Sequence, residues 1–407
     1  MFIHSVQTID KRFTLPEGFG SDATHTDPQY AYSVCVLKTN TKTEGIGLAF
    51  TLGAGNDLVC NAIEYLSTNL AGKEIEELMS DFGKTYRQMA DAPALRWLGP
   101  HKGVVHLALA AIVNACYDLW AKSRQVPLWQ LLLDLSPEAL VNTLDLSYLE
   151  DELTTEEAIN LLTAQKNTQK NRSTVLETGY KGYDTSVGWF NFSDEKIVKN
   201  TEEAIEHGFT AFKLKVGSHN PEVDLRRAAL IRKTTGDEAT IMLDANQKWN
   251  VPQAIHICKK LGDINPYWIE EPTHPDDVIG HKTIADAIDY KVAIGEHIPN
   301  KVVFKNFLQA KAMHFCQVDA VRVGGISEFL TISLLSKKFG IPVLPHVGDM
   351  GQIHQHLVLF NHIGMGHEHL FLEHIPHLRS FFKNPAIIKN GVYQVPQEAG
   401  SSSDLKP

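Results

Sequence analysis

The sequence predicts an α/β fold in which parallel strands and helices alternate and close into a barrel. Three observations predict it. Short apolar runs typical of buried strands recur along the second half of the chain, segments with helical spacing separate them, and a charged or polar residue ends each run. These end residues recur every 23 to 29 positions, which is the length of one strand, one helix and their loops. A closed barrel brings its strand ends to one rim, so we expect these residues to meet at one cavity.

The expected strands begin with a segment at residues 182–190, where Thr185 or Ser186 extends the series, and continue through seven apolar runs. These runs are residues 211–217, 241–246, 267–272, 292–297, 316–325, 341–348 and 370–375. The expected helices cover residues 224–234, 251–261, 281–288, 302–312 and 327–339, and several open with Pro, Ser or Asp. Eight strands alternating with helices indicate an α/β barrel over residues 138–375.

Residues 1–137 differ in pattern and are expected to form a separate α+β domain. The expected strands are residues 2–13, 30–39 and 46–52, and helical periodicity covers residues 58–86 and 103–123. The loop at residues 14–29 is long and rich in Gly, Asp and Pro. Such loops often act as lids, although a mobile insertion is the alternative.

The C-terminal segment, residues 376–400, is expected to return to the N-terminal domain. Residues 391–396 would supply a strand there, and the polar residues 397–407 are expected to fray.

Length and composition limit the class of function. The chain has 407 residues, 43% of them hydrophobic, which is enough for a large core. A net charge of -10 without a Lys/Arg run argues against nucleic acid or an anionic membrane as partner. The five cysteines are scattered without CxxC spacing, which indicates free thiols. Without a signal-like segment after Met1 or an apolar stretch of membrane-spanning length, we expect a cytoplasmic protein.

Three residues at strand ends are carboxylates. Asp244, Glu270 and Glu296 come from successive strands, without a Cys or a clear set of His beside them. Oxygen ligands with room for water and substrate favour Mg²⁺ over zinc or copper. Any one of them is as readily a helix cap or a lysine partner, but three at one rim repel each other unless a cation holds them. We therefore predict a magnesium site.

Lys213 and Lys215 lie two apart in one strand, so both side chains point to the same face, here the barrel interior. At an effective dielectric constant near 20, their repulsion is about 2 to 3 kcal/mol. We predict that this repulsion and a nearby metal ion lower the pKa of one lysine enough for it to act as a base near neutral pH.

Asp319 and His346 end consecutive strands on the opposite side of the expected barrel. An aspartate bonded to one imidazole nitrogen leaves the other nitrogen competent as acid or base, although a structural pair is the alternative. Glu373, on the last strand, is expected to contact a ligand or to form a structural salt bridge. A base on each face of a carboxylate substrate chelated to Mg²⁺ can racemise the α-carbon, or remove its proton and expel a β-hydroxyl.

Six barrel segments resemble the signature of the mandelate racemase branch of the enolase superfamily. They are KLKVG (213–217), LDAN (243–246), WIEEP (268–272), GEH (295–297), VDAVRVGG (318–325) and LPHVG (344–348). Further segments resemble the L-fuconate dehydratases of this branch, and the likeness spans nearly the whole chain. They are GSDATHTDPQY (20–30), RWLGPHKGVVHLA (96–108) and WIEEPTHPDDVIGH (268–281).

The resemblance implies a (β/α)₇β modified TIM barrel with an N-terminal α+β capping domain. Mg²⁺ is implied on Asp244, Glu270 and Glu296, with Lys215 and His346 as the acid/base pair and Asp319 supporting His346. The residues implied to contact substrate are Lys213, Glu373, Gly20, Ser21, Asp22, Tyr30, Val347 and Gly348.

The implied reaction is dehydration of an acid sugar, with L-fuconate giving 2-keto-3-deoxy-L-fuconate and water through an enediolate and β-elimination of the 3-hydroxyl. The implied partners are a small acid-sugar substrate and further copies of the chain in a homo-oligomer. Alternatives are a dehydratase of a galactonate- or arabinonate-like sugar, a racemase or epimerase of the superfamily, and a barrel that only binds a ligand. The His-rich residues 367–378 are expected to be surface histidines, with a transition-metal site as the alternative.

Two stretches depart from the family pattern. After His346 the chain reads VGDMGQIHQHL, shorter than usual and with Asp349 in place of a glycine. After Glu373 it reads HIPHLRSFF, with His374 and Pro376 in place of Tyr and Asp. Both stretches are expected near the distal end of the substrate, so they bear on the preferred sugar.

Overall fold

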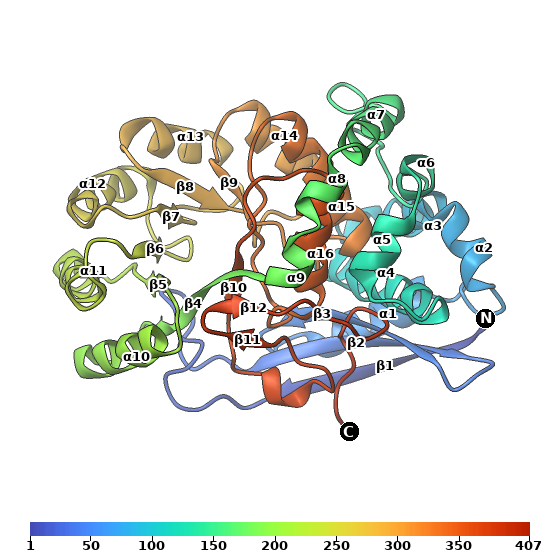
Figure 1. The fold of residues 1–407 in the computed structure, drawn as a ribbon, viewed down its shortest axis with the longest axis horizontal. Helices are drawn as coiled ribbons and strands as arrows, with labels where there is room; N and C mark the ends of the chain where they lie inside the picture. The colour runs from blue at the N-terminus through green and yellow to red at the C-terminus, as the bar shows by residue number, and fades with distance from the viewer.

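The computed structural model describes all residues, 1–407, and contains an N-terminal sheet with helices, followed by a parallel barrel (Figure 1). The N-terminal strands β1 (Ile3–Phe13), β2 (Tyr30–Thr39) and β3 (Glu44–Thr51) pair antiparallel in that order. The helices of this part are α1 (Asn56–Leu66), α2 (Ile75–Ser80), α3 (Phe82–Ala90), η1 (Pro93–Leu98), α4 (Gly103–Ser123) and α5 (Leu128–Asp134). In Figure 1 the N-terminal sheet, in blue, runs below the barrel.

The apolar helix α4 joins the N-terminal sheet to the barrel. It packs so closely on β3 that a Cβ at Gly47 would lie 1.9 Å from the carbonyl oxygen of Ala111. Asn114 of α4 donates to the carbonyl oxygens of Leu48 at 3.1 Å and Ala320 at 2.9 Å, so one side chain links both parts. By length and composition α4 could cross a membrane, contrary to the expectation from the sequence, but 89% of its apolar window is buried inside the protein.

The barrel contains the expected eight strand positions. Seven are β4 (Tyr180–Gly188), β5 (Ala211–Lys215), β6 (Thr240–Asp244), β7 (Trp268–Glu270), β8 (Lys291–Ile294), β9 (Phe315–Cys316) and β10 (Leu372–His374). The run at residues 341–348 contributes only a bridge between Cys316 and Val343, and β10 closes the barrel by pairing parallel with β4. The strand interiors are almost fully buried, as expected for parallel strands covered on both faces.

Helices surround the barrel and begin at recognisable sequence signals. They are α6 (Pro137–Val141), α7 (Thr155–Lys166), α8 (Gln169–Arg172), α9 (Val175–Thr178), α10 (Asp194–Glu206), α11 (Pro221–Thr235), α12 (Val251–Leu261), η2 (Gly262–Ile264), α13 (Val278–Ala287), α14 (Lys301–Gln309), α15 (Gly325–Lys338) and α16 (Gln352–Ile363). Asn250 and Gln253 form a capping box at the start of α12, and Pro252 lies in its first turn. Helices α15 and α16 are buried almost throughout.

The C-terminal segment returns to the N-terminal part as expected, where Leu128 N donates to Gly400 O at 2.8 Å, but it differs from two other expectations. The hairpin of β11 (Ile388–Lys389) and β12 (Val392–Tyr393), which follows η3 (Arg379–Phe381), pairs with β4 of the barrel and not with the N-terminal sheet. The last residues do not fray, because Ser401 is buried and donates through its amide N and Oγ to the Asp118 carboxylate of α4, at 2.7 and 2.9 Å.

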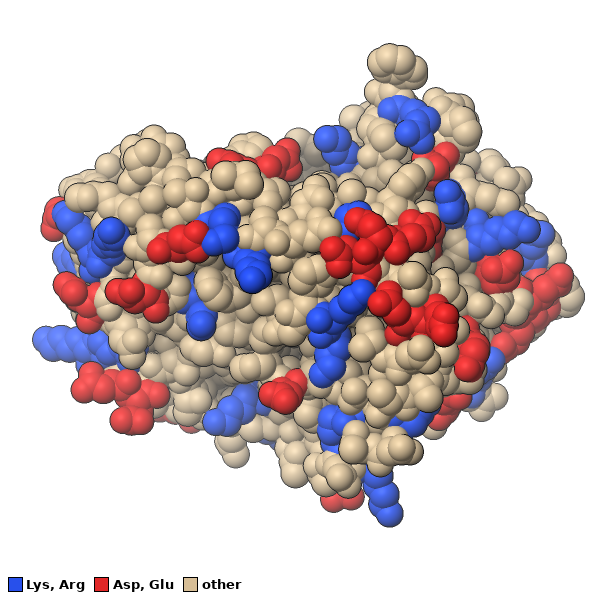
Figure 2. All heavy atoms as spheres, turned by 90° about the horizontal axis from the view of Figure 1, so that it is seen from above, with Lys and Arg blue, Asp and Glu red and all other residues tan.

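The cysteines agree with the expectation of free thiols. All five cysteines are free and buried. Figure 2 shows acidic and basic side chains interspersed on the face seen from above, without one continuous basic area there.

Candidate active site

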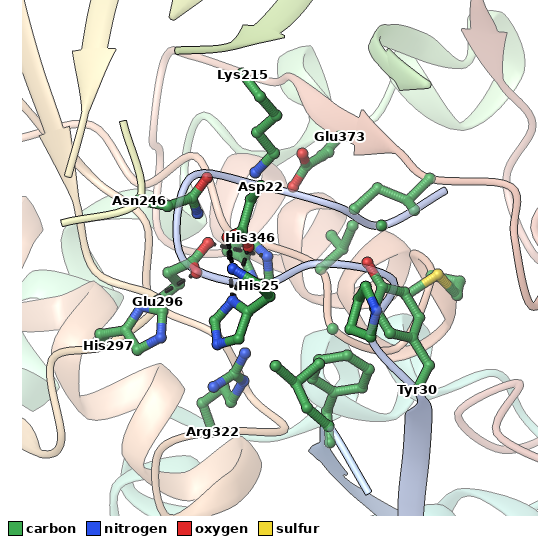
Figure 3. Close-up of a pocket in the computed structure, with 18 of the residues that line it drawn as sticks. Asp22, His25, Tyr30, Lys215, Asn246, Glu296, His297, Arg322, His346 and Glu373 are labelled. Atoms are coloured by element: carbon green, nitrogen blue, oxygen red, sulfur yellow. Dashed lines mark hydrogen bonds and ion pairs between the residues drawn. The ribbon is translucent and has the colours of Figure 1, made fainter. Parts of the chain in front are cut away.

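A cavity of about 230 Å³ opens at the rim where the barrel strands end. Lys215, Glu296, His346 and Glu373 line it, although they come from four different strand ends (Figure 3). Of the other residues expected at this rim, Asp244, Glu270 and Asp319 are fully buried and lie behind the cavity wall. The polar residues that recur at the strand ends in the sequence therefore surround one cavity.

Asp244, Glu270 and Glu296 form one carboxylate group, whose ligand oxygens lie within 4.8 Å of one another. Burial raises the pKa of Glu270 to about 8, with Lys213 opposing the shift and the neighbouring carboxylates adding to it. Glu296 Oε2 is buried and makes no hydrogen bond, although His346 Nε2 lies 3.0 Å away. Crowded buried carboxylates with an unpaired oxygen fit a divalent cation, and a ligand set made only of oxygen fits Mg²⁺.

A second possible ligand group, Glu271, Glu296 and His297, shares Glu296 with the first. His297 Nδ1 lies 2.9 Å from Glu271 Oε1, so these two side chains already satisfy each other. The first group is therefore the better candidate for a metal ion.

Lys213 and Lys215 extend from β5 toward these carboxylates. Lys215 Nζ donates to Asp244 Oδ2 at 2.5 Å, and Lys213 Nζ lies 2.8 Å from Glu270 Oε1 and 2.7 Å from Glu373 Oε1. Burial lowers the pKa of each lysine, but the carboxylates outweigh both burial and the repulsion between the lysines, and each pKa is raised. The predicted neutral lysine is therefore wrong for the protein without metal, because the carboxylates hold both protons in place.

His346 and Asp319 form the pair expected from the sequence. His346 Nδ1 lies 2.7 Å from Asp319 Oδ2, and the same oxygen accepts from Gly348 N at 3.0 Å. Burial lowers the pKa of His346, but Glu296 and Asp319 outweigh burial and raise it above the ordinary value. With Nδ1 engaged by Asp319, Nε2 is the nitrogen left for proton exchange.

The loop at residues 14–29 lies over the cavity as a lid. Among the contacts that hold it to the barrel, Phe190 N donates to Ser21 O at 2.9 Å, and Lys248 Nζ donates to Ala23 O at 3.0 Å.

Asp22 organises the tip of this lid. One carboxylate oxygen accepts from the amides of Thr24 and His25, each at 2.7 Å, and the other lies 2.9 Å from His25 Nδ1. Gly20 has φ 73°, and a Cβ there would lie 3.0 Å from the Tyr30 hydroxyl. Gly20, Asp22, His25 and Tyr30 all line the cavity.

Two residues expected to contact substrate lie elsewhere. Lys213 is buried beneath the cavity between Glu270 and Glu373. Ser21 is buried within the lid, where its Oγ accepts from Asp27 N at 2.9 Å. Val347 and Gly348 do lie on the cavity wall.

Four polar residues on the cavity wall were absent from the expected set. They are His25, Asn246, His297 and Arg322. Each lies within a segment that carried the family resemblance, and Asn246 follows the metal-ligand candidate Asp244 by two positions. Thr185, which the sequence left as one of two options, donates to Glu373 Oε1 at 2.5 Å, whereas Ser186 turns to Asp184.

The His-rich stretch forms no metal cluster, and of its histidines only His369 is exposed as expected. His367 is buried with Nε2 3.1 Å from Ser333 O, and His374 stacks on Phe209 with ring centroids 5.3 Å apart. The His377 ring packs against Phe19 and Trp189, at 5.0 and 5.1 Å. These histidines are packing partners, and His377 supports the lid.

Comparison with known proteins shows the family to which this chain is similar. Residues 196–407 match the family described as Enolase C-terminal domain-like. Mitochondrial enolase superfamily member 1 of Bos taurus is 43% identical over 98% of this chain and 92% of that protein. L-galactonate dehydratase of Hypocrea jecorina is 40% identical over 100% of this chain and 92% of its own length.

Solved structures agree in fold. Human mitochondrial enolase superfamily member 1 superposes with a TM-score of 0.96 at 40% identity, over 100% of this chain and 94% of the other. L-talarate/galactarate dehydratase from Salmonella typhimurium LT2, with Mg and L-lyxarohydroxamate, gives a TM-score of 0.76 at 26% identity, over 99% and 89%. The expected barrel with an N-terminal capping domain is confirmed.

Proposed function

Because this chain belongs to the enolase superfamily, we propose that it is an Mg²⁺-dependent acid-sugar dehydratase. The observation that carries the proposal is the arrangement of Lys215 and the His346–Asp319 pair at one cavity beside three clustered carboxylates. Dehydratases of L-galactonate and of L-talarate/galactarate among the relatives support the same class.

Lys215 and His346 are the two groups that move protons. Lys215 Nζ reaches the cavity from β5 and takes the proton at C2 of the acid sugar. His346, held through Nδ1 by Asp319, delivers a proton from Nε2 to the departing 3-hydroxyl. Glu373 faces the same cavity and orients substrate hydroxyl groups, with its position fixed by Lys213 at 2.7 Å and by Thr185 at 2.5 Å.

Asp244, Glu270 and Glu296 would hold the metal ion. When bound there, Mg²⁺ would supply positive charge that stabilises the negative charge the substrate gains when C2 loses its proton, and that weakens the hold of the three carboxylates on the lysine protons. The lid residues exclude water from the cavity while the protons move.

The side chains at the two ends of the cavity favour one acid sugar as the substrate. Asn246, Glu296 and His297 lie at one side in Figure 3, and Tyr30 lies at the other. The Tyr30 and Phe50 rings are 4.9 Å apart, and the wall also contains apolar residues. These include Leu52, Trp189, Val347, Met350 and Ile375.

L-Fuconate is 6-deoxy-L-galactonate, so it shares the configuration of L-galactonate and ends in a methyl group. With the substrate carboxylate at the Glu296 side, we expect C6 to extend toward the Tyr30 side. We therefore propose L-fuconate as the preferred substrate and L-galactonate as a weaker one.

We expect the Mg²⁺-loaded protein to convert both sugars to 2-keto-3-deoxy acids. An apolar pocket rejects an added hydroxyl group only weakly, so kcat/KM for L-fuconate should exceed that for L-galactonate by at most about 100-fold. Steady-state assays of keto-acid formation measure the ratio, with D-galactonate as a stereochemical control. Preference for L-galactonate would contradict the L-fuconate assignment, and turnover of no acid sugar would contradict the dehydratase.

Replacing Asp22 with alanine is expected to lower kcat/KM by about 10- to 100-fold. The Asp22 carboxylate both accepts the hydrogen bonds that shape the lid tip and faces the cavity, and the variant loses it. The melting temperature should stay nearly constant, since the hydrogen bonds of Asp22 are local to the loop. Thr24→Val is the matched control, because Thr24 bonds Asp22 but does not line the cavity. Equal losses in the two variants would mean that Asp22 acts only on lid shape.

A further inference from the structure

A second Asp–His pair, Asp349 and His354, lies directly behind Asp319. Both residues are fully buried and neither lies on the cavity wall. His354 Nδ1 lies 2.7 Å from Asp349 Oδ1, and His354 Nε2 lies 3.2 Å from Asp319 Oδ1. Two imidazole rings and two carboxylates therefore alternate in one buried chain that ends at the cavity with His346.

The Asp319 carboxylate is held from both sides by this chain. Oδ2 faces His346 Nδ1 at 2.7 Å, and Oδ1 accepts from Val321 N at 2.8 Å and faces His354 Nε2. His354 Nε2 also lies 2.9 Å from the amide N of Ala320, the next residue in the chain. His354 thus contacts both the side chain of Asp319 and the backbone that carries it.

Asp349 anchors this arrangement to the first turn of α16. Its Oδ1 accepts from Gly351 N at 3.0 Å, and its Oδ2 accepts from Ile353 N. The loop that leaves His346 and the helix that carries His354 are therefore tied by one side chain. Asp349 is also one of the positions at which the sequence departs from the expected family pattern.

We propose that Asp349 and His354 are positioning residues, which hold the Asp319 carboxylate and, through it, the His346 imidazole at the angle needed for proton transfer. His354 uses a different one of these two contacts in each protonation state. A protonated Nε2 donates to Asp319, and a neutral Nε2 accepts from the Ala320 amide. The inference rests on the proposed function, which gives His346 its role.

The test compares His354→Leu with His356→Leu in the full-length, Mg²⁺-loaded protein. His356 is the matched control, because it is equally buried on α16 but bonds Ser402 Oγ at 3.0 Å instead of Asp319. We expect His354→Leu to lower kcat by about 10- to 100-fold with little change in KM, as supporting hydrogen bonds at active sites commonly do. We expect His356→Leu to lower the melting temperature and to keep kcat.

A double mutant separates positioning from stability. If His354 acts through Asp319, adding His354→Leu to Asp319→Asn should cause little further loss of kcat, whereas independent effects would multiply. If His354→Leu does not fold, His354→Gln and Asp349→Asn replace it. The His354→Gln variant should keep a higher kcat than the Asp349→Asn variant, because the glutamine amide can still donate to Asp319.

A second readout does not depend on turnover. The Nδ1 proton of His346, identified by its loss in His346→Asn, should give a downfield ¹H NMR signal that shifts in His354→Leu and stays in place in His356→Leu. An unchanged signal, or equal losses of kcat in the two leucine variants, overturns the inference. Wild-type protein that dehydrates no acid sugar overturns the proposed function instead, and the NMR comparison still decides the positioning role.

Discussion

Replacing Lys215 with alanine is expected to abolish both dehydration of the acid sugar and exchange of its C2 proton with solvent. Lys215 is the lysine that faces the cavity, whereas Lys213 is buried beneath it between two carboxylates. Loss of a general base of this kind lowers kcat by about 10²- to 10⁴-fold. His346→Asn should lose elimination and keep part of the exchange, because the base on the Lys215 side is intact.

Proton NMR in D₂O measures both reactions at once, through loss of the C2 proton signal and growth of the keto acid. Lys291→Ala is the control, since Lys291 is an exposed lysine at the start of β8 and takes no part in the cavity. Exchange that survives in Lys215→Ala but disappears in His346→Asn would mean that the two residues have the opposite roles.

Removal of divalent metal is expected to stop turnover completely, and added Mg²⁺ should restore it. The three buried carboxylates leave Glu296 Oε2 without a hydrogen bond, and their mutual repulsion is relieved by a cation. Glu270→Gln should weaken Mg²⁺ binding by more than about 100-fold, because even residues that only support a metal ligand cost 10- to 100-fold when replaced.

Titration calorimetry of the metal-free protein measures that affinity without any substrate. Glu270→Gln should still fold, because Lys213 keeps its pairing with Glu373 at 2.7 Å. Circular dichroism checks the fold. Full turnover in metal-stripped protein, or unchanged Mg²⁺ affinity in Glu270→Gln, would contradict the assignment of the metal site.

The barrel could be predicted from the sequence because local pattern and global fold agree there. Apolar runs of strand length and the repeat of polar residues at their ends depend only on nearby residues and on the geometry of a parallel barrel. The helices that precede the barrel strands were harder to predict. Helices α6 to α9, between residues 137 and 178, were not anticipated, and residues 58–86 divide into three helices.

Long-range contacts account for the remaining differences. Residues 392–393 pair with β4, and Ser401 donates to Asp118 of α4. In both cases the partner lies more than 200 positions away in the sequence. The pKa values of Lys213 and Lys215 depend on carboxylates brought in by three other strands, which spacing within one strand cannot reveal. His25 and Arg322 were missed because a cavity wall includes loop residues that follow no repeat.

The most direct test of the proposed function is a proton NMR time course of the Mg²⁺-loaded protein with L-fuconate in D₂O. We expect L-fuconate to disappear as an equal amount of 2-keto-3-deoxy-L-fuconate forms, with deuterium at C3 and no build-up of a C2 epimer. A racemase or epimerase would instead produce the C2 epimer without any keto acid, and that result would contradict the dehydratase.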